Sequence, residues 1–123
     1  MTTADTAGPS RDRSVPAIDR SVLGEWLDGD DAAINELLAV FRDSVGAERQ
    51  RMAEALIKAD LTEYANAAHR LRGAALSMGA RVLAETAGSL YAAAKALDAA
   101  ACGAGMALLD THLGLVMAEV PTR

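Results

Sequence analysis

A histidine followed by a basic residue three positions later and a glycine four positions later is the arrangement in this chain that could do chemistry. These residues are His69, Arg72 and Gly73. A neutral imidazole is a nucleophile near physiological pH, because its ordinary pKa is about 6.5. A guanidinium one helical turn away could bind an anionic group placed on that ring. Gly73 has two interpretations: it leaves room for a reacting partner, or it lets another helix approach closely.

Further candidate residues share the same side of a helix. Asn66 lies one turn before His69, and Leu76 lies two turns after it. Leu76 is either a packed boundary residue or part of a small exposed apolar patch on which a partner docks. Arg70 and Arg81 add charge, so the segment from 69 to 81 holds three arginines and no acidic residue. We expect this local positive charge to stabilise an anionic group on the imidazole.

The element that positions these residues is predicted to be an amphipathic helix. Its apolar stripe recurs in steps of three and four, at Leu61, Tyr64, Ala68, Leu71, Ala75 and Met78. His69 therefore lies beside the buried stripe and should project into solvent. Asp60 with Glu63 forms a start resembling a capping box, and Gly79 is a candidate for a left-handed end.

A short helix is expected near the N-terminus. Asp19 can cap it, Ile18, Val22 and Trp26 share one side, and Gly29 can stop it. Such a short helix needs tertiary contacts. We therefore predict that Trp26 anchors it on the end of a larger bundle.

A long helix follows, from Asp30 or Asp31 to about Ala59. Gly46 and Glu48 interrupt its apolar stripe, so it is either one bent helix or two helices that meet near Gly46. The absence of a proline or a turn cluster favours one helix. The charged residues in its second half are interpreted as a solvent-facing surface, and they are Glu48, Arg49, Arg51 and Glu54.

The last two helices complete the predicted fold. One carries a heptad stripe that runs from Ala80 through Leu97 to Ala101 and ends at the segment 103–105, Gly-Ala-Gly. The other has the stripe Met106, Leu109, Leu113, Val116 and Val120. No strand alternation occurs. We predict an all-α protein, an antiparallel up-and-down four-helix bundle with a short N-terminal capping helix over residues 16–123, after a disordered tail at 1–15.

Composition limits the possible partners and compartments. The net charge of −5 argues against nucleic acid or an anionic membrane as a main partner. Cys102 is the single cysteine, so no intramolecular disulfide forms and a reducing cytoplasm is expected. We find no signal peptide and no apolar run near membrane-spanning length, and we expect a soluble monomer.

The segment AHRLRGAALSMGA resembles the signature of histidine-containing phosphotransfer (HPt) domains. The matching residues are His69, Leu71, Arg72, Gly73, Ala74 and Gly79, and the likeness extends over roughly residues 17–120. The family most often has lysine where this chain has Arg72, which keeps the charge and changes its geometry. His112 has no comparable setting and is interpreted as a boundary histidine without a function.

The resemblance implies a bacterial, cytoplasmic phosphorelay protein. His69 would accept a phosphoryl group from a receiver-domain aspartate and pass it to another receiver, with Arg72 stabilising the phosphate and Gly73 giving access. Partners would be response-regulator receivers and hybrid or sensor histidine kinases, with Mg²⁺ on the receiver and no cofactor in this chain. We see no phosphate-binding glycine loop, so we do not expect a kinase.

Two alternatives come from other functional classes. The first is a bundle that docks on receivers or kinases without carrying phosphate. The second is a metal or haem site, which is weaker because two histidines and one cysteine without a Glu-x-x-His pair do not make a ligand set. We therefore expect no metal in this chain.

Overall fold

The computed structural model describes residues 17–120, and these form five helices with no strand among them. The helices are α1 (Arg20–Trp26), α2 (Asp31–Ile57), α3 (Leu61–Ser77), α4 (Arg81–Lys95) and α5 (Ala99–Glu119). The all-α prediction is confirmed. The predicted tail at 1–15 lies outside the described residues.

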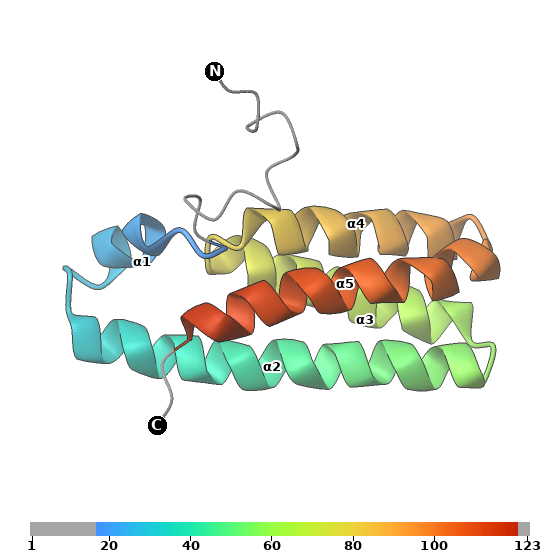
Figure 1. Ribbon diagram of the computed structural model, residues 1–123, viewed down its shortest axis with the longest axis horizontal. Helices are drawn as coiled ribbons and strands as arrows, with labels where there is room; N and C mark the ends of the chain where they lie inside the picture. The colour runs from blue at the N-terminus through green and yellow to red at the C-terminus, as the bar shows by residue number, and fades with distance from the viewer. Residues whose placement is uncertain (1–16, 121–123) are drawn as a thin grey trace, which may run out of the picture.

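Helices α2 to α5 lie side by side, and the chain reverses direction at each of the three loops between them (Figure 1). Helix α1 lies beyond the ends of α3, α4 and α5, alongside the first turns of the longer α2 and near the loop between α3 and α4 (Figure 1). The core lies between the long helices and consists mainly of leucine, alanine, valine and methionine, with buried Phe41 and Tyr64. Small alanine side chains let the helices pack closely.

Aspartates begin four of the five helices. The side chains of Asp19, Asp30, Asp60 and Asp98 each accept a hydrogen bond from a backbone N–H in the first turn. These caps satisfy N–H groups that have no partner within the helix. The sequence predicted the caps Asp19 and Asp60, left the second helix open between Asp30 and Asp31, of which Asp30 is the cap, and missed Asp98.

The single-helix interpretation of the segment from Asp31 is confirmed, because α2 runs without a break through Gly46 to Ile57. The end of α3 is also as expected. Gly79 has φ +72°, and Ala80 N–H donates to Ala75 C=O at 2.8 Å. This is the left-handed helix end that glycine favours.

The predicted boundary between the last two helices is wrong. Helix α4 ends at Lys95 because Leu97 takes a left-handed conformation, with φ 60°, and is 77% exposed. Asp98 then caps α5, so the Gly-Ala-Gly segment 103–105 lies inside a helix. One of these glycines has a packing reason, because a Cβ on Gly105 would overlap with Leu90 Cδ2.

The predicted role of Trp26 is also wrong. Its side chain is 70% exposed, and Val22 is exposed as well. Ile18 and Leu23 are buried instead and attach the N-terminal segment to the core. Apolar residues occur on two sides of α1, so the sequence pattern alone does not decide which side faces the bundle. In the structure the side that carries Leu23 faces the core.

The expectation that the sequence has no apolar run near membrane-spanning length is wrong for α5. By length and composition alone it could cross a bilayer, so an apolar run of that length is present in the sequence. A core helix of a soluble protein meets the same criterion, but such a helix is mostly buried, whereas 33% of this window of α5 is buried. Here Leu109, Leu113 and Val116 of α5 are buried within the bundle.

Candidate functional site

His69 projects from the side of α3 into solvent. Its neighbours Ala68 and Leu71 are fully buried, whereas His69 itself is exposed. The apolar stripe therefore faces the core and rotates the imidazole by about 100° away from it. The exposure that the sequence predicted for this ring is confirmed.

Tyr91 of α4 lies against the imidazole. The two ring centroids are 5.4 Å apart and the rings are tilted by 43°. This is a favourable distance for an aromatic pair. Tyr91 is half-buried and lies against one side of the His69 ring, and His69 remains exposed. Sequence reasoning missed Tyr91, because no local spacing links a residue of α4 to one of α3.

His69 opens onto a hollow of about 870 Å³ between α3 and α4. Helix α3 contributes Arg72 and Leu76 to its lining, and α4 contributes Arg81, Glu85 and Tyr91. Asn66 is exposed one turn before His69 and is not part of this lining. The structure thus brings together His69, Arg72, Leu76 and Arg81 of the predicted residues.

Arg70 is turned away from this group, which corrects its predicted place beside the anion. Its Nε lies 3.1 Å from both carboxylate oxygens of Glu48 on α2, and its Nη2 lies 3.5 Å from Glu63. The hydrogen bond from Arg70 to Glu48 raises the pKa of this guanidinium. Because Arg70 follows His69 by about 100° around α3, it faces α2 and not α4.

Glu48 does not belong to a solvent-facing surface, contrary to the sequence interpretation. Glu48 is 8% exposed, and it also forms an ion pair with Arg51, whose Nη1 lies 3.1 Å from Glu48 Oε2. Arg49 binds both carboxylate oxygens of Asp110 on α5 at 2.9 Å. Glu48 and Arg49 can therefore lie on the sides of α2 that face α3 and α5, because each is paired with a residue of opposite charge on that helix.

Arg72 and Arg81 form no ion pair with any of the residues 17–120. Both guanidinium groups line the hollow beside His69, so their hydrogen-bond donors are available to an incoming anion. Glu85 lines the same hollow and brings a negative charge that the count from 69 to 81 did not include.

Gly73 is exposed, and a Cβ built on it would meet nothing within 4 Å among the described residues. The interpretation that Gly73 admits another helix of this bundle is therefore wrong for the described chain. Open space remains one turn above His69.

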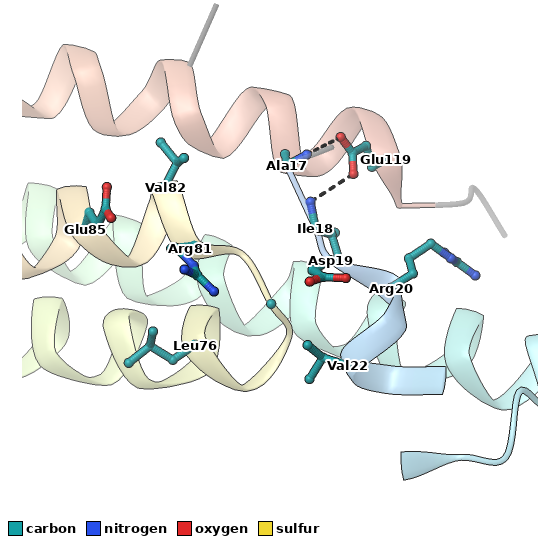
Figure 2. Close-up of a pocket in the computed structure, with 11 residues that line it drawn as sticks. Ala17, Ile18, Asp19, Arg20, Val22, Leu76, Arg81, Val82, Glu85 and Glu119 are labelled. Atoms are coloured by element: carbon teal, nitrogen blue, oxygen red, sulfur yellow. Dashed lines mark hydrogen bonds between the residues drawn. The ribbon is translucent and has the colours of Figure 1, made fainter. Parts of the chain in front are cut away.

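A second hollow of about 640 Å³ continues from the first toward α1 (Figure 2). The two share Leu76, Arg81 and Glu85. In the view of Figure 2, Arg81 lies above Leu76 of α3, and Asp19 at the start of α1 lies on the opposite side of this hollow. Hydrogen bonds from Ser21 hold the pKa of Asp19 below its usual value, and the charge of Arg81 contributes less.

Leu76 is 49% exposed, so it is not a packed boundary residue. With Val22 of α1, which is also exposed, it gives the second hollow an apolar edge. Glu119 holds the chain at this point, because its carboxylate accepts hydrogen bonds from the N–H groups of Ala17 and Ile18 (Figure 2).

His112 is a core residue and not a boundary histidine. It is 6% exposed, and its Nδ1 lies 2.6 Å from Thr86 Oγ1. Its Nε2 has no hydrogen-bond partner within the described residues. Burial lowers the pKa of His112. Its neutral form is therefore the one that fits the core.

Residues 17–120 contain no group of three His, Cys, Asp or Glu side chains that could hold a metal ion. Comparison with known proteins returned no match among curated proteins and none among solved structures. A family model described as Hpt domain matches residues 36–119, which is more than half of the chain and includes His69 and its surroundings. The chain therefore belongs to the Hpt domain family.

Proposed function

We propose that His69 is the residue that carries the phosphoryl group in this chain. Membership of the Hpt family implies a histidine phosphotransfer role in a two-component phosphorelay. In the proposed step, the unprotonated ring nitrogen of His69 attacks the phosphorus of an aspartyl phosphate on a receiver. A P–N bond forms, the P–O bond breaks, and the aspartate carboxylate leaves. The reverse reaction at a second receiver regenerates the free imidazole.

The main support is the position of His69 beside a hollow lined by two arginines that form no ion pair within the described part of the chain. The ring is exposed, and Arg72 and Arg81 make no ion pair with residues 17–120. Arg72 would bind the phosphoryl oxygens while charge moves from the leaving carboxylate to the ring. The open space at Gly73 would let the partner's phosphate approach in line with the imidazole.

The exposed surface around His69 would be the docking face for the partner. Leu76 would supply apolar contact, and Arg81 with Asn66 would supply polar contacts at its edge. The proposed partners are response-regulator receiver domains and hybrid or sensor histidine kinases. We do not assign Arg70 to this proposed face, because its guanidinium is paired with Glu48 on α2.

The chain would act as a carrier, which agrees with a family of phosphocarrier modules without kinase activity. Mg²⁺ on the receiver would neutralise phosphoryl charge, so this chain would supply only the nucleophile, cations and docking face. We further propose that the protein works as a monomer in the bacterial cytoplasm, without binding nucleic acid or membrane.

The test is phosphoryl transfer from a phosphorylated, labelled receiver to the chain and to His69→Gln. Thr62→Gln is the matched control, since Thr62 is exposed near the start of the same helix and outside the hollow. We expect label on the wild type and the control, lost in acid and stable in base, and none on His69→Gln.

Equal loss of receiver phosphate with and without the imidazole would contradict the carrier role. A complex that forms without any transfer would instead favour the alternative of an adaptor that docks on receivers.

A further inference from the structure

Gly88 on α4 lies directly beneath the side chain of Arg72 on α3. A Cβ built on Gly88 would lie 3.2 Å from Arg72 Nε and 3.3 Å from its Cδ. These separations are shorter than ordinary van der Waals contact, so an alanine here requires the arginine to move by a few tenths of an ångström.

Gly88 occupies the middle of α4, where glycine is unfavourable relative to alanine. Its φ is not in the left-handed region, so backbone conformation does not explain it. The stem of Arg72 is the nearest group that a Cβ would meet. The missing side chain therefore has a packing reason, which is the place that it leaves for this arginine.

The side chain of Arg72 packs against α4 at Gly88. Arg72 forms no ion pair and no side-chain hydrogen bond with residues 17–120, in contrast to Arg70 and Arg49. Its Cδ and Nε lie against α4 at Gly88, and both residues line the hollow onto which His69 opens. The stem of Arg72 thus lies against α4 in the hollow that His69 also lines, and its hydrogen-bond donors are unused within residues 17–120.

We propose that Gly88 is a positioning residue that keeps Arg72 beside His69 and acts only through this arginine. The inference rests on the proposed phosphoryl transfer at His69. In Gly88→Ala the methyl group lifts the Arg72 stem from α4 and displaces the guanidinium from the phosphoryl oxygens. Small displacements of a charge-stabilising group lower the rate of group transfer.

The test is a double-mutant cycle with wild type, Gly88→Ala, Arg72→Ala and the double variant. The phosphoryl donor is phosphoramidate, which needs no identified partner, and the readout is the rate of label incorporation. We expect Gly88→Ala to lower this rate roughly 3- to 10-fold when Arg72 is present and to have no further effect in Arg72→Ala.

The matched control is Gly103→Ala in α5, because a Cβ there meets nothing within 4 Å. It should leave the rate unchanged. An equal loss from Gly88→Ala in both backgrounds would overturn the inference, because the effect would then not pass through Arg72. An unchanged rate in Gly88→Ala would also overturn it, while the effect of Arg72→Ala would still support phosphoryl transfer.

A second readout does not depend on function. We expect the NMR signal of the Arg72 Nε–H group to shift in Gly88→Ala and to stay in place in Gly103→Ala. If this signal is the same in both variants, the proposed contact is wrong, whatever the transfer rates are. If the signal shifts but the wild type takes up no phosphate, the placement of Arg72 stands and the proposed function fails.

Discussion

Arg70 and Arg72 are two residues apart on α3, and the structure gives them opposite roles. Arg70 pairs with the buried Glu48 on α2, whereas Arg72 lies at the hollow without an ion pair among residues 17–120. We predict that Arg70→Ala lowers stability with little effect on phosphoryl transfer. Arg72→Ala should lower the rate of phosphoryl transfer with little effect on stability.

The size of each effect follows from burial and hydrogen bonding. The side chain of Glu48 is 10% exposed and that of Arg70 is 47% exposed, so their pair lies between a surface pair and a buried one. Glu48 keeps Arg51 as a second partner, which limits the loss. We expect Arg70→Ala to lower the free energy of unfolding by about 1 kcal/mol, which is a Tm decrease of roughly 4 °C or more.

For Arg72 the relevant quantity is the stabilisation of the transition state. A charge-assisted hydrogen bond contributes about 1.5–3 kcal/mol. Its loss corresponds to a rate decrease of roughly 10- to 150-fold. Because Arg72 is exposed and forms no ion pair with residues 17–120, its removal should change stability by less than about 0.5 kcal/mol.

The assay combines thermal unfolding, followed by circular dichroism, with single-turnover transfer from a phosphorylated receiver. A large loss of phosphoryl transfer in Arg70→Ala at unchanged Tm would refute the assignment of a structural role to Arg70 and a transfer role to Arg72. So would an Arg72→Ala variant that transfers at the wild-type rate.

Three further predictions concern His112, Leu97 and Tyr91. Burial lowers the pKa of His112 below the ordinary value of an imidazole, about 6.5, so as the pH falls the unfolded chain binds a proton before the folded one does. The urea midpoint of unfolding should be constant above about pH 6.5 and should fall as the pH drops below it, and His112→Gln should weaken this dependence. Leu97 is exposed with φ 60°, so Leu97→Gly should raise the free energy of unfolding by about 0.5 kcal/mol; a lower Tm would contradict this. Tyr91→Phe should keep the ring contact with His69 and the transfer rate, whereas Tyr91→Ala should lower the rate several-fold; equal rates in both variants would show that the ring has no role.

The sequence predicted well what depends on local periodicity. The exposure of His69 follows from its place beside the stripe of Ala68 and Leu71, and the helix starts at Asp30 and Asp60 follow from side-chain caps. These features need only the geometry of one helix. The same holds for the left-handed end at Gly79.

Features that depend on contacts between helices were not predictable in this way. The pair of Arg70 with Glu48 joins two helices, so neither residue shows it in its own sequence surroundings. The contact of Tyr91 with His69 also joins two helices. Trp26 was misplaced because the direction of α1 is set by Ile18 and Leu23.

The break between α4 and α5 was missed for a different reason. Leu97 occupies a left-handed position that glycine usually takes, so the heptad of alanine and leucine continued through it without a visible stop. The cap of Asp98 was the signal in the sequence that could have located this turn.

The most direct test of the central claim is to map the phosphorylated residue by tandem mass spectrometry after the chain has reacted with a phosphorylated receiver. Of the two histidines, His69 is exposed and His112 is buried. We predict a phosphoramidate on His69 alone. A phosphoryl group on another residue, or an unmodified chain after the receiver has lost its phosphate, would contradict the account.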